Sequence, residues 1–377
     1  MKITKIEAIP CTIPRKEGGP GSNVVLVKIH TDEGIIGAAD GGTCNQDTIM
    51  LAIKQWEHLL IGADPMNIGL IVNSLQRGFT HNLVAQGTID FALHDVVGKA
   101  LNMPVYQLLG GKACEKLAIG MMISHGTALE RAKQSEKVVA AGIKNIVCKV
   151  GPGWGSTVWD DIANIKAIRE AVGDEVLLGV DANGGLDYST ALDLSLRLEQ
   201  FNLYKVEQPV PTWDVEGLAR LRSKLHTPVW AHESAIEIPG LMDCIKRDAT
   251  DGACIKVVWT GGIIQSRKWA AIAEAANLAI TCGSMVGSGY EASAQAHFLA
   301  ADPWMTKFAH ANLGPPLLHN QWDTTNPPIT TDIAKNPPVY KDGYFYPPDG
   351  PGLGLELNEE YIPRLITPGK APITLGG

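Results

Sequence analysis

Short β-branched runs alternate with amphipathic helical patterns along most of this chain, and that alternation limits the folds open to it. The predicted strands are 116–123, 144–150, 176–181, 203–207, 228–232, 253–258, 278–282 and 306–310. The predicted helices between them are 128–141, 159–172, 188–200, 213–225, 236–248, 263–276 and 289–300. Such a repeat is typical of parallel strands joined by crossover helices. It predicts a (β/α)₈ barrel, with a doubly wound open sheet as the alternative.

The chain has room for a second domain, because it contains 377 residues and a barrel of this kind takes about 200–250. Residues 1–112 show strand alternation first and helical periodicity afterwards, which predicts an α+β domain. The barrel is expected to occupy residues 113–326. Residues 327–377 are rich in proline and glycine and are expected to pack back on the first domain as a tail. The glycine-rich segment 14–22 is either a plain hairpin loop or a lid that orders over a ligand.

Composition narrows the function classes and the compartment. The net charge of −8 argues against a general nucleic-acid or anionic-membrane surface. The seven cysteines are scattered and form no CxxC pair, which is typical of a reduced, intracellular protein. The N-terminus lacks the apolar core of a signal peptide, and no apolar run reaches the length of a membrane span. We therefore expect a cytoplasmic protein with no membrane or nucleic-acid partner.

Ionisable residues end five consecutive predicted strands, at the edge where such barrels hold their catalytic groups. They are Lys149, Asp181, Glu207, Glu233 and Lys256. The three acids follow one another at intervals of 26 residues, one βα unit each, so that they lie side by side on one rim. Three like charges in a partly dry site repel one another, and a divalent cation relieves that repulsion. Oxygen ligands indicate Mg²⁺, with Mn²⁺ as the alternative. A single acid such as Asp181 would equally suit a helix cap.

Two lysines, Lys149 and Lys256, each end an apolar strand, although lysine is rarely buried without a partner. In one interpretation they neutralise the carboxylates or extend to the rim. In the other they perform general acid–base chemistry, because burial and a nearby cation lower the pKa of a lysine. The residues alone leave both interpretations open.

Several motifs resemble the enolase superfamily, in particular its muconate lactonizing enzyme subgroup. They are TIDFALHD at 88–95, GK at 98–99, LLGG at 108–111, VDAN at 180–183, VEQP at 206–209, Lys256 five residues before the glycine pair 261–262, and GPGLG at 350–354. This resemblance covers nearly the whole chain. It implies a modified (β/α)₇β barrel with an α+β capping domain, and a magnesium ion that binds the substrate carboxylate. It also implies Lys149 and Lys256 as an acid–base pair on opposite faces of the substrate.

The sequence departs from the family pattern at positions that bear on the site. Val147 replaces the first lysine of a Lys-x-Lys motif in which Lys149 is the second. His232 stands where the third metal-binding aspartate is usual, so that His232 competes with Glu233 as the third ligand. The segment 308–313 lacks the aspartates with which amino-acid epimerases of this family hold a substrate ammonium.

The function implied by the resemblance is removal of the proton α to a carboxylate through an enolate. A muconate cycloisomerase-like cycloisomerase or a racemase/epimerase is the leading interpretation. A dehydratase of sugar acids or hydroxy acids is the alternative, and a non-catalytic binding protein on this fold is the third. The expected substrate is a small carboxylate, with contacts from Asn183, Trp259, Met285 and Asn312, although Trp259 equally suits plain packing. The resemblance also implies a homo-oligomer, an octamer or a dimer.

Overall fold

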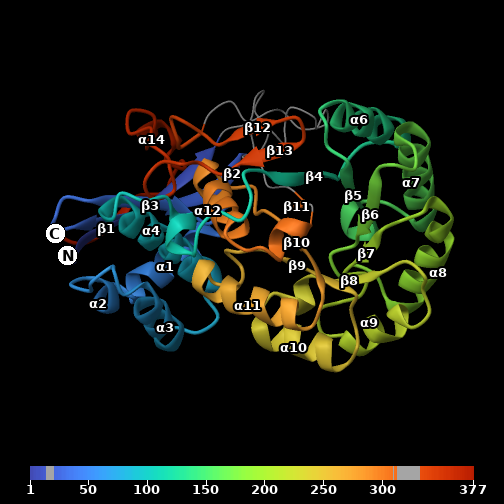
Figure 1. The fold of residues 1–377 in the computed structure, drawn as a ribbon, viewed down its shortest axis with the longest axis horizontal. Helices are drawn as coiled ribbons and strands as arrows, with labels where there is room; N and C mark the ends of the chain where they lie inside the picture. The colour runs from blue at the N-terminus through green and yellow to red at the C-terminus, as the bar shows by residue number, and fades with distance from the viewer. Residues whose placement is uncertain (14–20, 309, 312–331) are drawn as a thin grey trace.

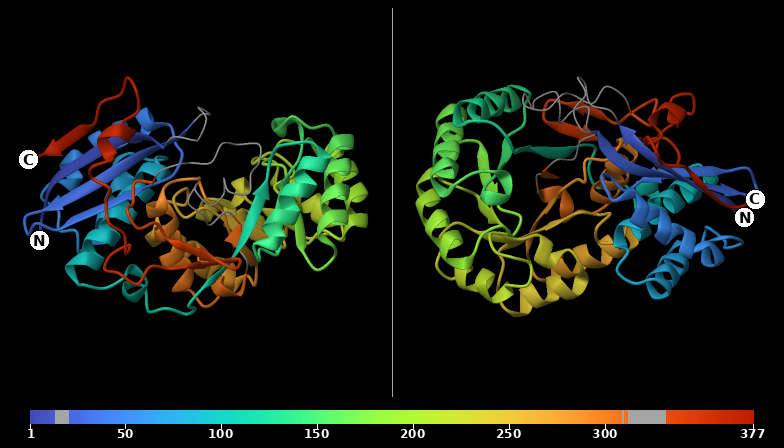
Figure 2. Two further views of the ribbon diagram at one scale, coloured as in Figure 1. Left: turned by 90° about the horizontal axis from the view of Figure 1, so that it is seen from above. Right: turned by 180° about the vertical axis from the view of Figure 1, so that it is seen from behind.

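The computed structural model describes residues 1–13, 21–308, 310–311 and 332–377. An N-terminal domain and a barrel lie side by side, as Figure 1 and the two further views in Figure 2 show. Most of the lid predicted at 14–22 lies outside the described residues, and so does Asn312.

The N-terminal domain is an antiparallel sheet with helices packed on it. Its strands, in the order β14-β1-β2-β3, are β1 (Ile3–Ile13), β2 (Ser22–Thr31), β3 (Ile36–Asp40) and β14 (Ile373–Gly376). Its helices are α1 (Gln46–Gln55), α2 (Glu57–Leu60), α3 (Ile68–Gly78), α4 (Leu83–Ala100) and α5 (Val105–Leu108). Helix α4 is buried on all sides because it contacts both the sheet and barrel helix α11 (Ile263–Ala275). No helix in the described part of the chain is long and apolar enough to cross a membrane.

The barrel strands lie within a few residues of the predicted positions, except the last. Strands β4 (Leu117–Ile123), β5 (Asn145–Lys149), β6 (Leu177–Asp181), β7 (Lys205–Glu207), β8 (Val229–Ala231), β9 (Gly252–Ile255) and β10 (Ala279–Cys282) pair in parallel and in chain order. The helices α6 (Ala128–Ala140), α7 (Val158–Val172), α8 (Tyr188–Leu198), α9 (Val215–Arg222), α10 (Ile238–Lys246), α11 and α12 (Gly289–Ala300) surround them (Figure 2). This arrangement confirms the predicted barrel and excludes the open sheet.

The eighth strand differs from the prediction of a strand at 306–310. Met305–Lys307 form a 3₁₀ turn, because the Asp302 carboxylate accepts hydrogen bonds from the backbone N–H groups of Trp304 and Met305 at 2.8 and 3.1 Å. Strand β11 comprises His310–Ala311, which pairs in parallel with β4. The neighbouring strand β10 reaches β11 through a side chain, since the backbone N–H of Cys282 donates to Nδ1 of His310 at 3.1 Å.

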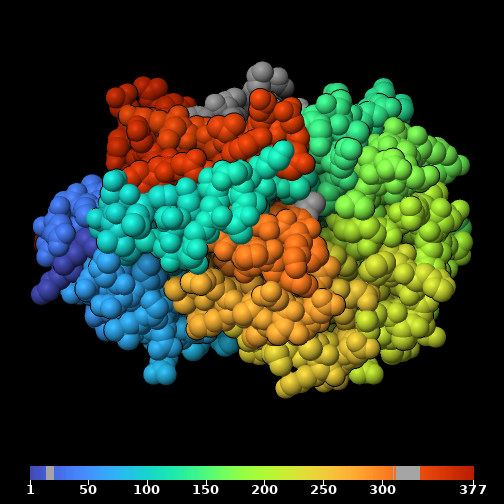
Figure 3. All heavy atoms as spheres, viewed as in Figure 1, coloured from blue at the N-terminus to red at the C-terminus, as the bar shows by residue number. Residues whose placement is uncertain are grey.

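The C-terminal segment contacts both domains, not the first domain alone. Strand β14 extends the N-terminal sheet, whereas β12 (Val339–Lys341) and β13 (Tyr344–Tyr346) form a hairpin that pairs with barrel strand β4. In Figure 3 this red segment covers the junction between the two domains. Gly352 has a φ of +67°, and a Cβ there would overlap the Asp95 carboxylate. Glycine therefore lets the segment approach α4, where the N–H of Leu353 donates to Asp95 at 2.8 Å.

A buried carboxylate of the N-terminal domain caps a barrel helix. Asp90 on α4 is fully buried and accepts hydrogen bonds from the backbone N–H groups of Ile263 and Ile264 at 2.6 and 3.3 Å. These are the first N–H groups of α11, which have no partner within their own helix. The contact fixes the capping domain against the strand ends of the barrel.

Candidate active site

The five ionisable residues predicted at strand ends lie at neighbouring positions on one rim of the barrel. Lys149, Asp181 and Glu207 are the last residues of β5, β6 and β7, and the ladder pairs Lys149 with Asp181 and Asp181 with Glu207. Glu233 follows β8 by two residues, and Lys256 directly follows β9. Register-matched residues of parallel strands face the same side, so the structure brings the predicted groups together.

The Lys149 ammonium lies against the carboxylate of Asp181. Its Nζ donates to Oδ2 of Asp181 at 2.5 Å and to Oδ1 of Asn183 at 2.6 Å. Lys149 is only 8% exposed, and Asp181 is fully buried. Burial, together with the neighbouring Glu207 carboxylate, raises the pKa of Asp181, while the Lys149 ammonium opposes that shift. Lys149 therefore provides counter-charge for the acidic centre.

Asn183, one of the predicted substrate contacts, connects the residues around it. Its backbone N–H donates to Oδ1 of Asp181 at 2.8 Å, and its side-chain amide donates to Oε1 of Glu233 at 2.7 Å. The φ of Asn183 is +46°, a left-handed conformation that asparagine tolerates better than most residues. This backbone conformation and these bonds hold Glu233 and Lys149 in fixed positions relative to Asp181.

A second buried lysine, which the sequence reasoning missed, pairs with Glu207. Lys205 lies two residues earlier on β7, is fully buried, and forms an ion pair with Oε2 of Glu207. Its Nζ lies 4.5 Å from the centroid of the Trp230 ring. Although burial alone would raise the pKa of Glu207, the Lys205 ammonium holds that pKa well below its usual range. The sequence could have identified Lys205 through the period of two along a strand, which places Lys205 and Glu207 on one face.

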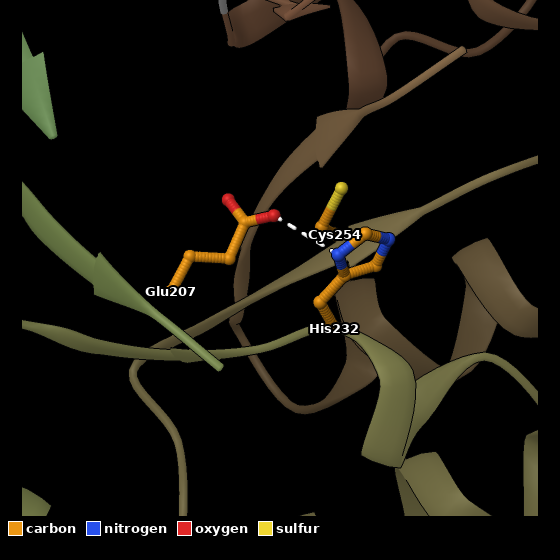
Figure 4. Close-up of side chains that lie close together, drawn as sticks. All are labelled: Glu207, His232 and Cys254. Carbon is orange, nitrogen blue, oxygen red and sulfur yellow. Dashed lines mark ion pairs between the residues drawn. The ribbon is translucent and has the colours of Figure 1, made fainter. Parts of the chain in front are cut away.

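His232 lies between two of the predicted acidic ligands. Its Nδ1 is 3.1 Å from Oε1 of Glu207 and 3.3 Å from Oε2 of Glu233. The ring is 2% exposed and stacks on Trp259, with 6.2 Å between the ring centroids. Neither ring nitrogen makes a hydrogen bond of normal geometry with any residue that the structure describes, and the same holds for Oε2 of Glu233. Figure 4 shows the imidazole turned toward Glu207.

Lys256, which follows β9, contacts an aromatic ring. Its Nζ lies 3.9 Å from the centroid of the Trp259 ring, a cation–π contact. Within the described part of the chain, Lys256 forms no ion pair with a carboxylate, whereas Lys149 does. Trp259 therefore contacts both the lysine and the imidazole of His232, so that it orients two polar groups.

Met285 lies where the capping domain meets the barrel. Its backbone N–H donates to the buried Glu291 carboxylate at 2.7 Å, and its carbonyl accepts from the N–H of Thr43 at 2.8 Å. Burial raises the pKa of Glu291 to about 7, and the neighbouring Asp40 carboxylate adds to that shift. The loop that carries Met285 is thus fixed from both domains at the edge of the site.

The acidic residues present suit a hard divalent cation. Asp181 and Glu207 are buried neighbours, and one oxygen of each is held by an ammonium group, from Lys149 and Lys205 respectively. Oε2 of Glu233 has no hydrogen-bonding partner of normal geometry among the described residues. Oε1 of Glu207 faces the imidazole of His232. Buried carboxylate oxygens in such an arrangement are ligands that Mg²⁺ prefers.

Known proteins similar to this chain share both of its domains. Residues 130–361 match the family described as "Enolase C-terminal domain-like", and residues 10–110 match "Mandelate racemase / muconate lactonizing enzyme, N-terminal domain". N-succinyl-L-Arg/Lys racemase of Bacillus cereus is 31% identical over 97% of this chain and 98% of its own. Chloromuconate cycloisomerase of Cupriavidus necator is 30% identical over 90% of each chain. A solved structure of a mandelate racemase/muconate lactonizing family protein from an Azoarcus species is 42% identical, with a TM-score of 0.92 over 99% of this chain and 100% of its own.

Proposed function

This chain belongs to the mandelate racemase/muconate lactonizing enzyme family of the enolase superfamily, and from that premise we propose which residues carry its reaction and on what substrate. The enzyme is an isomerase, a cycloisomerase or a racemase/epimerase, that removes the proton α to a carboxylate through an enolate. Its substrate is a small carboxylate. The residues that act on it follow from the contacts at the strand ends.

The proposed metal centre consists of Asp181, Glu207 and Glu233, with Mg²⁺ as the ion and Mn²⁺ as the alternative. When bound, such an ion attracts the substrate carboxylate and stabilises the negative charge that develops on it. Support comes from three acids on successive strand ends, two of them fully or almost fully buried. Asn183 keeps Glu233 directed toward the centre through its 2.7 Å hydrogen bond.

The proposed acid–base pair is Lys149 and Lys256. Lys149 ends β5 and Lys256 directly follows β9, and the three acid-bearing strands lie between them, so the two lysines would reach a bound α-carbon from opposite faces. Lys149 already donates to Asp181 and Asn183, and we assign to it the role of the acid. Among the described residues, the partner of Lys256 is an aromatic ring and not a carboxylate, so we assign proton removal to Lys256. Racemisation needs both lysines, whereas cycloisomerisation needs one for proton transfer.

The proposed substrates are carboxylates without a free α-ammonium group. The segment 308–313 supplies no acid to hold an ammonium. Trp259 and Met285 offer apolar surface at the rim. Asn183, whose amide also bonds Lys149 and Glu233, and Asn312, which lies outside the described residues, complete the proposed contact set. N-succinyl amino acids fit this description and are the substrates named for the racemase relative, while muconates are those named for the cycloisomerase relative.

Two wider properties are also proposed. All seven cysteines are free thiols, which supports a reducing, cytoplasmic location. A homo-oligomer, an octamer or a dimer, rests on family resemblance alone. Light scattering at micromolar concentration tests the second proposal, and a monomer would end it.

A deuterium-exchange screen tests the proposed function. The full-length protein with Mg²⁺ in D₂O is incubated with N-succinyl amino acids, other N-acyl amino acids, free dipeptides and muconates. We expect α-deuterium in at least one N-acyl amino acid, or lactone formation from a muconate, and no exchange in dipeptides. Removal of the metal by chelation serves as the control and is expected to stop turnover. Exchange in dipeptides alone would overturn the proposed substrate class.

A further inference from the structure

We propose that Glu207, His232 and Cys254 form a second, mixed-ligand metal site that takes a thiophilic divalent ion of the Zn²⁺ or Co²⁺ type. One ligand atom from each of the three residues lies within 4.8 Å of those of the other two. Figure 4 shows Glu207 and His232 facing each other, with Cys254 beside the imidazole. An oxygen, a nitrogen and a sulfur donor, from β7, from the end of β8 and from β9, therefore lie close together inside the barrel.

The imidazole of His232 is the first argument for this site. It is 2% exposed, and among the described residues its Nε2 has no hydrogen-bonding partner, while its Nδ1 faces the carboxylates of Glu207 and Glu233 at 3.1 and 3.3 Å without normal hydrogen-bond geometry. A buried polar atom without a partner is costly, by about 1–3 kcal/mol. An ion bound to a ring nitrogen would remove that cost at the nitrogen that it binds.

The spacing of the donor atoms fits a tetrahedral ion. Two ligands about 2.0–2.1 Å from such an ion lie roughly 3.3 Å apart. Nδ1 of His232 and Oε1 of Glu207 are 3.1 Å apart. The other Glu207 oxygen is occupied by the Lys205 ammonium, so that Glu207 offers one oxygen to a metal and not two.

Cys254 provides the third donor. It is 2% exposed and lies two residues before Lys256, so the strand places both side chains on one face. Among the described residues, its thiol makes one long hydrogen-bond contact, 3.8 Å from Sγ to the carbonyl oxygen of Ile255. A small neighbour adjoins the sulfur, because a Cβ at Gly283 would lie 3.5 Å from Sγ. Residue 283 therefore places no side chain against the sulfur.

The donor set selects the ion. Thiolate and imidazole favour Zn²⁺ and Co²⁺, whereas Mg²⁺ prefers oxygen ligands and an octahedral shell. Three protein ligands also leave a fourth position open. Glu207 belongs both to this site and to the magnesium centre of the proposed function. If that centre is correct, the two ions exclude each other, and Zn²⁺ is an inhibitor competitive with Mg²⁺.

Cobalt spectroscopy on the full-length, chelator-treated protein tests the site without any activity measurement. We expect one equivalent of Co²⁺ to give visible d–d bands together with a thiolate charge-transfer band in the near ultraviolet. Cys254→Ser should abolish the charge-transfer band. His232→Gln should weaken Co²⁺ binding by more than about tenfold, since even groups that only support a ligand are worth about 10–100-fold.

Matched controls separate the site from its surroundings. Cys282→Ser changes a buried cysteine on the neighbouring strand, and Glu233→Gln changes an acid of the proposed magnesium centre. Both should leave the charge-transfer band in place. X-ray absorption of the zinc-loaded wild type is a test that needs no variant and should show one sulfur at about 2.3 Å. Absence of that sulfur, or a charge-transfer band that survives in Cys254→Ser, would overturn the proposal. The deuterium-exchange screen tests the proposed function and does not depend on the outcome of these metal-binding experiments.

Discussion

Lys205 and Glu207, two residues apart on β7, form an ion pair inside the barrel in which neither side chain is more than 3% exposed. The pair leaves one oxygen of Glu207 facing His232, at 3.1 Å from Nδ1. Burial of two charges is expensive, and the pair persists because each charge compensates the other. Removal of one partner therefore has a larger effect than removal of a surface lysine.

We predict that Lys205→Met destabilises the protein by about 3–5 kcal/mol at pH 7, because it leaves the buried Glu207 charge without its partner. Urea unfolding followed by circular dichroism measures the change. Saturating divalent metal should recover part of the loss, since a cation at Glu207 replaces the missing positive charge.

The matched control is Lys28→Met. Lys28 also pairs with a glutamate, but the side chain of that partner, Glu359, is 56% exposed. A pair with an exposed partner contributes about 0–1 kcal/mol. A Lys205→Met variant as stable as Lys28→Met would show that Glu207 does not depend on its buried partner.

We predict that Lys256→Ala loses α-deuterium exchange by about 10²–10⁴-fold, the usual contribution of a general base. Lys149→Ala should lose exchange to a similar extent from the opposite enantiomer if the reaction is a racemisation. The measurement is exchange from each enantiomer separately, with Mg²⁺ at saturation. Wild-type exchange in both variants would exclude both lysines as the base.

The sequence predicts most of this site because a charged residue at the end of an apolar strand is visible in the sequence. Asp181 and Glu207 follow apolar runs at an interval of one βα unit, and that interval alone places them side by side. The family and the fold were readable for the same reason, since the motifs lie at strand ends and along the buried helix α4. The eighth strand was not readable, because the Asp302 side chain forms a local turn that no periodicity reveals.

Lys205 and Cys254 show what a pattern of strand ends misses. Both lie inside short strands, where a single polar residue has no spacing signal beyond the period of two. The residue near Cys254, His232, comes from another strand end, and the sequence does not show that the two side chains lie close together. A search for polar residues two positions before each strand-end group would have found both.

We predict that Asn183→Gly is more stable than Asn183→Ala by about 1 kcal/mol, because residue 183 has a φ of +46° that glycine adopts without strain. Both variants lose the side-chain bonds to Lys149 and Glu233, so both should lose activity to the same extent. Thermal unfolding and initial rates check the two parts. If Asn183→Gly were more active than Asn183→Ala, in line with its higher stability, the positioning role of Asn183 would be contradicted.

The last prediction concerns acid sensitivity. Burial lowers the pKa of His310 to about 4, from an ordinary value near 6.5. The unfolded chain therefore takes up a proton near pH 6.5, and the folded protein does so only near pH 4. The contribution of neutral His310 to stability is fully present above pH 6.5 and is lost as the pH falls toward 4. The slope approaches about 1.4 kcal/mol per pH unit.

His310 is neutral in the fold because its two nitrogens have opposite tasks. Nδ1 accepts from the N–H of Cys282 at 3.1 Å, and Nε2 therefore carries the proton and donates to the carbonyl of Met305 at 3.1 Å. Protonation of Nδ1 would break the link between β10 and β11.

His310→Asn should be less stable than the wild type at pH 7.5 but should lose less stability between pH 6.5 and 4.5. Urea unfolding across that pH range measures the loss of stability. His226→Gln, a substitution of an exposed histidine, is the control. An equal slope in wild type and His310→Asn would mean that other groups cause the acid sensitivity.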